Sequence, residues 1–178
     1  MLFNLEKHFA RMAAKEMAPQ RLEDRQRDVY DSHRHRVFSV SFYMTGNEIE
    51  AEEILTGTFV RAFNRAPEPD HNLVDNALLE ELKQRLPVES DEGQPLPANS
   101  FLALGRNVLR TDLEEAIRCL PAQERLIFLL MDVEGYPAKR VAELLQLNES
   151  VVFRTAIRAR MRLRAELAAM RTEGERAA

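Results

Sequence analysis

A short amphipathic segment, a tight connection and a longer basic segment follow one another between Pro137 and Arg164. The first segment reads Pro137-Ala-Lys-Arg-Val-Ala-Glu-Leu-Leu145, with its proline in the first turn, where a helix tolerates proline best. The connection is Gln146-Leu-Asn148, and its asparagine suits the N-cap of a second helix. A supporting helix, a turn of three or four residues and a second helix have the spacing of a helix-turn-helix.

The second segment predicts a helix with a buried stripe and a basic outer face. Between Ser150 and Arg164 there are five arginines and no acidic residue, and Arg154 and Arg158 lie opposite the stripe with Arg162 beside them. Arginines on the outer face of a docked helix can pair with DNA phosphates or with guanine edges. The segment therefore favours DNA contact, although a solvated basic face would have the same composition. The expected stripe, at 100° per residue, consists of Val152, Ala156, Ala159, Leu163 and Leu167.

The remaining periodicity is also helical, and we expect an all-α fold. A helix is expected over Val29–Tyr43, with Gly46 as its left-handed terminus, and another from an N-cap at Asn47 to about Phe63. Further helices are expected over residues 1–17, 73–86, 111–120, 123–133, 137–145 and 149 to about 170. No strand pattern accompanies them.

Low periodicity separates two groups of helices. Residues 87–100 hold three prolines, one glycine and three acids, a composition typical of a linker. We therefore predict two small helical bundles joined by a linker, the second containing the helix-turn-helix. The expected division is an N-terminal helical extension (1–20), a first domain (21–87), a linker (88–109), a helix-turn-helix domain (110–170) and a tail (171–178).

Composition restricts the class of protein. The chain has 178 residues, 45% hydrophobic and 30% charged, the balance of a globular protein with a core. No apolar run approaches the roughly 18 residues of a membrane span, and charges interrupt the N-terminal stretch, so we expect a cytoplasmic protein without membrane insertion. The single cysteine, Cys119, lies beside Leu120 and is expected to be a buried thiol.

The chain lacks the usual signatures of catalysis and cofactor binding. Its six glycines form no nucleotide-binding loop, and its four histidines have no zinc-ligand spacing. No nucleophile elbow or Cys/His arrangement is present. Acidic pairs such as Glu52-Glu53 are more typical of solvated helix faces than of acid–base chemistry. We expect no enzyme activity, no cofactor and no metal.

Two stretches, which together cover roughly half the chain, resemble a known family and occur in the same order as in that family. The first is Tyr30-Asp-Ser-His-Arg-His-Arg-Val-Phe-Ser-Val-Ser-Phe-Tyr-Met-Thr-Gly-Asn47, continuing to Phe63. The second is Leu113-Glu-Glu-Ala-Ile-Arg-Cys-Leu-Pro-Ala-Gln-Glu-Arg-Leu-Ile-Phe-Leu-Leu-Met-Asp-Val-Glu-Gly-Tyr136, continuing through the helix-turn-helix to Arg164. Together they resemble the extracytoplasmic-function group of bacterial RNA polymerase sigma factors.

The resemblance implies partners for both domains. The first domain, sigma region 2-like, would bind core RNA polymerase mainly through residues 51–63 and melt the downstream promoter element; the implied contacts are Glu52, Glu53, Thr56 and Arg61. The second, sigma region 4-like, would bind the upstream promoter element through the helix that starts at Glu149; the implied contacts are Ser150, Arg154, Thr155, Arg158 and Arg162. The resemblance also allows an anti-sigma factor as a partner.

Three departures from the family pattern fall on these surfaces. Thr56-Gly57 stands where a Gln-Glu pair is usual, and a glycine inside a helix costs about 1 kcal/mol relative to alanine. Residues 64–100 carry eight acidic and three basic side chains, and the chain has no tryptophan, whereas strand melting usually employs aromatic and basic groups. In the last helix, the usual Lys-Ser-Arg has become Phe153-Arg154-Thr155, and the usual turn glycine is Gln146.

Two functions remain open from the sequence. The first is a sigma factor that directs core polymerase to specific promoters. The alternative is a sigma-like interaction protein that keeps the fold without opening promoters, which the three altered surfaces would favour. Phe153 could contact bases or pack against Ile157, and packing is the preferred interpretation.

Overall fold

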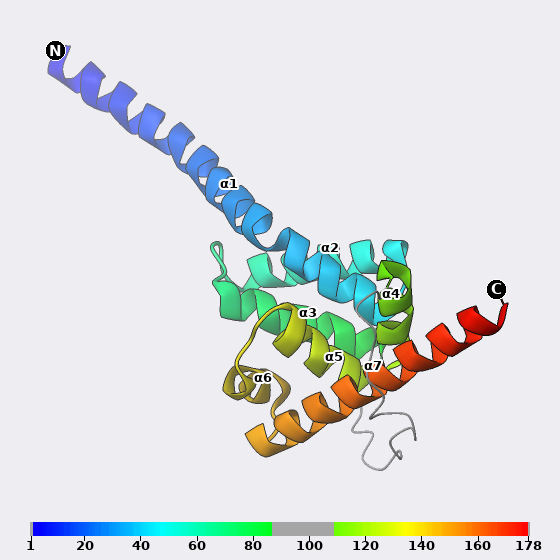
Figure 1. Cartoon of the computed structure of the whole chain (residues 1–178). Coiled ribbons are helices and arrows are strands. Elements are labelled where there is room, and N and C mark those ends of the chain that lie inside the picture. Colours follow the sequence, from blue (N-terminus) through cyan, green and yellow to red (C-terminus); the bar gives the residue numbers. More distant parts are fainter. Residues whose placement is uncertain (1, 87–108, 178) are drawn as a thin grey trace.

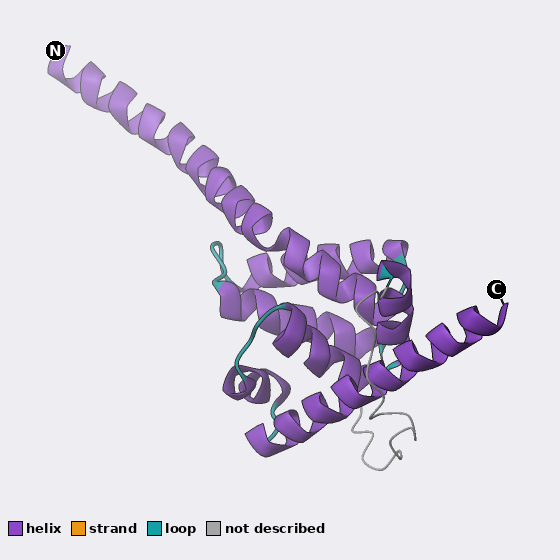
Figure 2. Cartoon of the chain, viewed as in Figure 1, coloured by secondary structure: helices purple, strands orange, loops and turns teal. Residues whose placement is uncertain are grey.

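A computed structural model describes residues 2–86 and 109–177, with side chains for residues 21–86 and 109–170. Within these ranges the chain consists of helices and short connections without a strand, as Figure 2 shows. The expected all-α class is confirmed, and the helices form two groups that pack together (Figure 1). All of the predicted linker except Leu109 lies outside the described residues.

The first bundle is built from α1 (Leu2–Thr45), α2 (Glu48–Arg65) and α3 (His71–Arg85). The N-terminal segment and the Val29–Tyr43 segment, expected as separate helices, form the single helix α1, whose first half projects from the molecule (Figure 1). The helix continues past Pro19, which lies between the two segments, and the residues that follow it (20–27) are mostly Gln, Arg, Leu and Glu, which are strong helix formers.

The turn between α1 and α2 has the predicted chemistry. Gly46 has a φ of +70°, the left-handed conformation that glycine adopts at no steric cost, and its N–H donates to the Phe42 carbonyl at 2.7 Å. The Asn47 side chain accepts from the N–H groups of Ile49 (2.9 Å) and Glu50 (3.4 Å). Both predicted caps are confirmed, and α2 therefore folds back along α1.

The second bundle contains α4 (Arg110–Cys119), α5 (Ala122–Phe128), the π-helical turn η1 (Leu129–Val133), α6 (Ala138–Leu145) and α7 (Glu149–Ala177). One helix was expected over residues 123–133; the chain instead changes from α to π winding at Leu129. Helix α7 crosses α4, α5 and α6 (Figure 1). The predicted α7 stripe is confirmed, because all five of its side chains are buried.

Cys119 corrects one expectation. Its thiol is exposed, whereas Ala116, Ile117 and Leu120 form the buried side of α4 and the residue after it. Cys119 follows Arg118, also exposed, on the outer side of a ten-residue helix. The apolar neighbour Leu120 therefore does not predict burial of Cys119, because consecutive residues at the end of a helix point to different sides.

The two bundles share one connected cluster of buried apolar side chains, which extends from Val37 on α1 to Leu167 on α7. They are also joined by Arg125 on α5, whose Nη1 donates to the carbonyl of Met44 at 2.8 Å. Met44 belongs to the last turn of α1, where carbonyl groups lack helical partners and the helix dipole favours a cation. The packing between the bundles is thus both apolar and polar.

A buried carboxylate makes the most extensive polar contact between the bundles. Asp75 on α3 is 3% exposed and pairs with Arg36 of α1, while Arg140 of α6 lies 3.4 Å from its second oxygen. The Tyr136 hydroxyl donates to both Asp75 oxygens at 3.0 and 3.1 Å, and accepts from Arg36 at 2.7 Å. His71 Nε2 lies 2.6 Å from the same hydroxyl. We call these five residues the Asp75 hub.

The tyrosine of the Asp75 hub remains protonated at neutral pH. Burial raises the pKa of the Tyr136 hydroxyl, Arg36 lowers it less, and Asp75 adds to the rise, so the pKa lies well above its ordinary value near 10. A protonated hydroxyl can donate to the carboxylate, and this donor satisfies a buried acceptor that would be costly to leave unpaired. The Asp75 hub therefore connects three helices and the turn before α6 through the hydrogen bonds and ion pairs of one carboxylate.

A second buried carboxylate explains the glycine inside α2. Gly57 faces Glu81 on α3, and a Cβ at position 57 would lie 2.7 Å from the Glu81 carboxylate. Arg61 Nη2 holds that carboxylate at 2.6 Å, and Arg85 also pairs with it. Burial acts to raise the pKa of Glu81, but the hydrogen bonds and charges of Arg61 and Arg85 outweigh it, so the pKa lies below its ordinary value. Gly57 thus provides space for a paired, buried acid.

We predict that Asp75→Asn lowers the free energy of unfolding by about 3 kcal/mol, because the substitution leaves the Arg36 guanidinium buried without its counter-charge. Chemical denaturation of the full chain measures this change. Asp31→Asn is the matched control, since Asp31 pairs with Arg34 at the surface of α1 (side chains 51% and 46% exposed) and should change stability by under about 1 kcal/mol. A loss for Asp75→Asn no larger than the control would contradict the central role of the hub.

We predict that Gly57→Ala destabilises the chain by about 1–2 kcal/mol, although alanine has the better helix propensity by about 1 kcal/mol. The new methyl group must displace the Glu81 carboxylate from its two arginines. Thr56→Ala, at the exposed neighbouring position, should stay within about 0.5 kcal/mol of the wild type. Stabilisation by Gly57→Ala would show that Glu81 moves freely.

Candidate nucleic-acid interface

The turn between α6 and α7 keeps helix-turn-helix geometry without its glycine. Gln146 adopts the left-handed conformation (φ +57°, ψ +41°), which costs a non-glycine residue about 1 kcal/mol. The N–H of Leu147 then donates to the Ala142 carbonyl at 2.9 Å and closes α6. The Asn148 carbonyl accepts from Val151 (2.9 Å) and Val152 (3.1 Å), which places Asn148 at the predicted start of α7.

The five arginines of α7 fall into two groups. Arg158 Nε lies 3.3 Å and Arg162 Nε 3.0 Å from oxygens of Glu124, a carboxylate on α5 that is 3% exposed. Arg160 pairs with Asp132 at 2.9 Å. By contrast, Arg154 and Arg164 are exposed and form no ion pair with the described part of the chain. The first group attaches α7 to its own bundle, and the second is available to a partner.

The exposed side of α7 has a definite composition. We call it the α7 outer face; it consists of Ser150, Phe153, Arg154, Ile157 and Arg164. Of the residues predicted to contact DNA, Ser150 and Arg154 lie on it. Thr155 is 8% exposed, beside the buried stripe. The side chains of Arg158 and Arg162 are 27% and 11% exposed and face Glu124.

Phe153 and Ile157 are both partly exposed on α7. Phe153 is 49% exposed and Ile157 is 52% exposed, so neither belongs to the buried core, and the expected packing of Phe153 against Ile157 stays a prediction. At 100° per residue Ile157 lies about 120° from the centre of the buried stripe and Phe153 about 80° from it. Periodicity therefore indicated exposure more clearly for Ile157 than for Phe153.

The predicted polymerase-binding residues also divide by exposure. Glu52, Glu53 and Thr56 are exposed on one side of α2, together with Ile49 (70% exposed) and Val60 (57% exposed). We call these five residues the α2 outer stripe. Arg61 is directed elsewhere, because its guanidinium binds Glu81 at 2.6 Å and Glu80 at 3.3 Å on α3.

The acidic segment after α2 uses its carboxylates internally where it is described. Glu68 pairs with Arg25 at 2.8 Å, Asp70 caps α3 by accepting from Leu73 N–H at 2.8 Å, and Glu80 pairs with Arg65 at 2.7 Å. Asp75 and Glu81 form the two buried sites described above. The acidic excess that the sequence shows there is therefore largely structural in residues 64–86.

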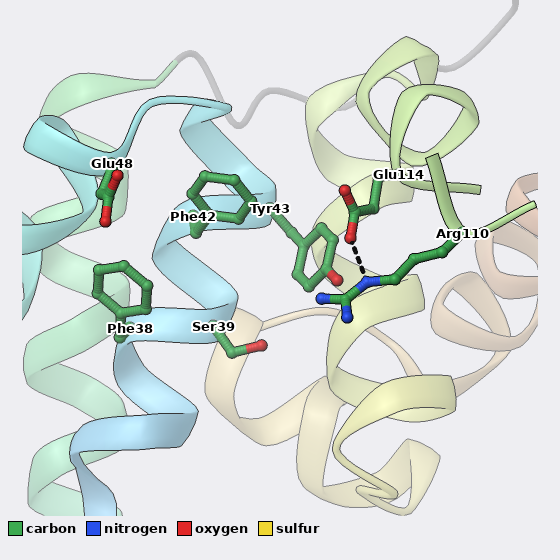
Figure 3. Close-up of a pocket in the computed structure, with 7 residues that line it drawn as sticks. All are labelled: Phe38, Ser39, Phe42, Tyr43, Glu48, Arg110 and Glu114. Atoms are coloured by element: carbon green, nitrogen blue, oxygen red, sulfur yellow. Dashed lines mark hydrogen bonds and ion pairs between the residues drawn. The ribbon is translucent and has the colours of Figure 1, made fainter. Parts of the chain in front are cut away.

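A cavity of about 330 Å³ lies where the bundles meet at the end of α1. Figure 3 shows its aromatic wall on α1 facing the ion pair between Arg110 and Glu114 of α4, which are 2.8 Å apart. Because both bundles contribute to it, the cavity depends on their packing. The lining residues are Phe38, Ser39, Phe42, Tyr43, Glu48, Arg110 and Glu114.

The side chains described for residues 21–86 and 109–170 include no group of three His, Cys, Asp or Glu arranged to hold a metal ion. No helix within residues 2–86 and 109–177 is long and apolar enough to cross a membrane. The arrangement that remains is a helix-turn-helix with free arginines and a second helix, α2, with an exposed acidic and apolar stripe.

Comparison with known proteins agrees with this arrangement. Residues 110–163, which include the whole helix-turn-helix, match the family described as "Sigma-70, region 4". The chain is 26% identical over 151 residues to the ECF RNA polymerase sigma factor SigE of Mycolicibacterium smegmatis. That alignment covers 76% of this chain and 59% of SigE, so the chain spans less than two thirds of this relative.

A solved structure has a similar fold. The sigma factor RpoE of Bartonella quintana, crystallised in complex with the anti-sigma factor NepR, superposes with a TM-score of 0.58 at 16% sequence identity. The match covers 79% of this chain and 92% of that one, hence both bundles and not the helix-turn-helix alone. Residues 110–163 thus match the region 4 family of sigma-70 factors, and the chain as a whole is similar in sequence to an extracytoplasmic-function sigma factor and in fold to a second sigma factor.

Proposed function

We propose that the chain is an RNA polymerase sigma factor, which binds core polymerase and directs it to specific promoters. The observation that carries this proposal is the α7 outer face, because Arg154 and Arg164 are exposed and have no ion pair with the described part of the chain, while carboxylates engage the other arginines. In this function the chain is not a catalyst. It contributes binding energy that positions the polymerase and opens DNA.

We assign the two bundles to the two ends of the promoter. Residues 110–170 form the region 4-like domain, and α7 lies in the major groove of the upstream element, with Ser150 and Arg154 nearest the bases. Residues 21–87 form the region 2-like domain, which binds core polymerase and the downstream element. Residues 88–109 connect them.

We assign the α2 outer stripe to core polymerase. Glu52 and Glu53 offer two carboxylates to a basic partner, and Ile49 and Val60 supply apolar area at either end. Large apolar side chains this exposed on one side of a helix are typical of a binding surface. Arg61 then acts indirectly, since its ion pairs with Glu80 and Glu81 hold α2 against α3.

The proposed partners are core RNA polymerase and promoter DNA, and we place the chain in the cytoplasm with them. An anti-sigma factor is a further proposed partner, supported by the fold shared with RpoE, which was crystallised with one.

The decisive experiment is co-purification of the full chain with core RNA polymerase of its own source, followed by run-off transcription on genomic fragments. We expect a stable complex and discrete start sites. A complex without transcripts would support the sigma-like alternative, a protein that binds polymerase without opening promoters. Absence of a complex would contradict the assignment of the α2 outer stripe.

We predict that Arg154→Ala weakens DNA binding, whereas Arg158→Ala lowers the stability of the fold. Arg154→Ala removes a free cation, so it should weaken binding to the mapped upstream element about tenfold or more and leave the unfolding free energy within about 0.5 kcal/mol. Arg158→Ala removes an arginine that pairs with buried Glu124 and should cost about 1–2 kcal/mol of stability.

Filter binding and chemical denaturation of both variants test this division. If Arg154→Ala transcribes normally from a promoter that requires its upstream element, or if Arg158→Ala loses DNA binding without loss of stability, the division of the arginines is wrong.

A further inference from the structure

Two apolar side chains lie together on the α7 outer face. Phe153 and Ile157 are four positions apart, so they lie one helical turn apart on the same side, and each is about half exposed. Arg154 lies about 60° around the helix from Ile157, and Arg164 lies two turns further along the axis, in line with the two apolar side chains. The face thus has two apolar side chains with one cation beside them and a second cation further along the helix.

The charge of this face selects its partner. From Ser150 to Arg164 the helix carries no carboxylate, and two of its exposed arginines, Arg154 and Arg164, form no ion pair with the described part of the chain. A complementary partner is anionic near these arginines and apolar opposite Phe153 and Ile157. The major groove of duplex DNA offers both, because phosphates line its walls and thymine presents a 5-methyl group in its floor.

Phenylalanine and isoleucine also restrict which bases this face can recognise. Neither side chain can hydrogen-bond, so each would leave the O6 of guanine or the N4 amino group of cytosine without a partner when it displaces water from that edge. The thymine methyl group instead gains from contact with an apolar side chain. The pair therefore distinguishes thymine from cytosine by the methyl group.

We propose that Phe153 and Ile157 are specificity-determining residues that recognise thymine methyl groups in the upstream promoter element. This inference rests on the proposed function and adds its sequence preference. The lysine that the family usually has at position 153 would bind phosphate or guanine, so this chain should prefer a different element.

The test uses the complex of the full chain with core polymerase and a library of randomised duplexes joined to a fixed downstream element. After selection, the preferred duplex is resynthesised with uracil in place of each thymine in turn, which removes only the methyl group. We expect thymine at one or two adjacent positions of the selected element. At those positions uracil should weaken binding about fourfold, which corresponds to the approximately 0.8 kcal/mol of one buried methyl-sized group.

The variant Phe153→Ala tests whether this side chain is the group that recognises the thymine methyl group. This variant should bind the thymine and uracil duplexes equally, and Ile157→Ala should reduce the difference. Val133→Ala is the matched control, because Val133 is also 49% exposed in the same bundle but lies outside the α7 outer face; it should discriminate as the wild type does. Thermal melting of each variant verifies that these exposed substitutions leave the fold intact.

Other outcomes would show whether the thymine inference alone fails or the proposed function fails with it. Selection of an element at which uracil and thymine bind equally would overturn the inference and leave the proposed function intact. Loss of core polymerase binding by Phe153→Ala in the absence of DNA would also overturn it, because the pair would then be a protein contact. Absence of any sequence enrichment by a complex that forms would contradict promoter recognition itself, and the inference with it.

Discussion

One buried carboxylate, Asp75, determines how the two halves of this protein meet. Its charge is satisfied by Arg36 from α1, by Arg140 from α6 and by the protonated hydroxyl of Tyr136, so helices far apart in sequence are held at one point. A charge that is 3% exposed requires such partners, since its removal from water is costly. The position of α6 follows from these contacts, and α7 packs on α6. The direction of the α7 outer face therefore depends on a residue of the other bundle.

Two other carboxylates act in the same way within the bundles. Glu124 engages Arg158 and Arg162, and Glu81 engages Arg61 and Arg85. Buried acids thus separate the arginines that maintain the fold from those that remain free for a partner. Of the five arginines of α7, this separation leaves Arg154 and Arg164 on the surface that we assign to DNA. Arg61 belongs to the arginines that maintain the fold, because it pairs with Glu80 and Glu81.

The unusual residues of the chain have local physical reasons. Gly57 stands in α2 because the Glu81 carboxylate occupies the space of a side chain, and Gln146 adopts the left-handed conformation in which a glycine would be usual. The described acids of residues 64–86 are capped or paired within the protein. These departures from the family pattern are accommodated by the fold, so they do not by themselves indicate a lost function. The change at Phe153 differs, because its side chain is about half exposed on the outer side of α7.

The sequence by itself determined the helical class, the caps at Gly46 and Asn47, the buried stripe of α7 and the helix-turn-helix, because periodicity and capping are local properties. It also determined the order of the two groups of helices. Only the tertiary structure decided that α1 is continuous, that Cys119 and Phe153 are exposed, and which arginines are free. Glu124 reaches Arg162 across 38 positions of sequence and Arg36 reaches Asp75 across 39, and such pairs exist only once the helices have packed. Exposure and pairing depend on which surfaces other helices cover, and that is a property of the whole fold.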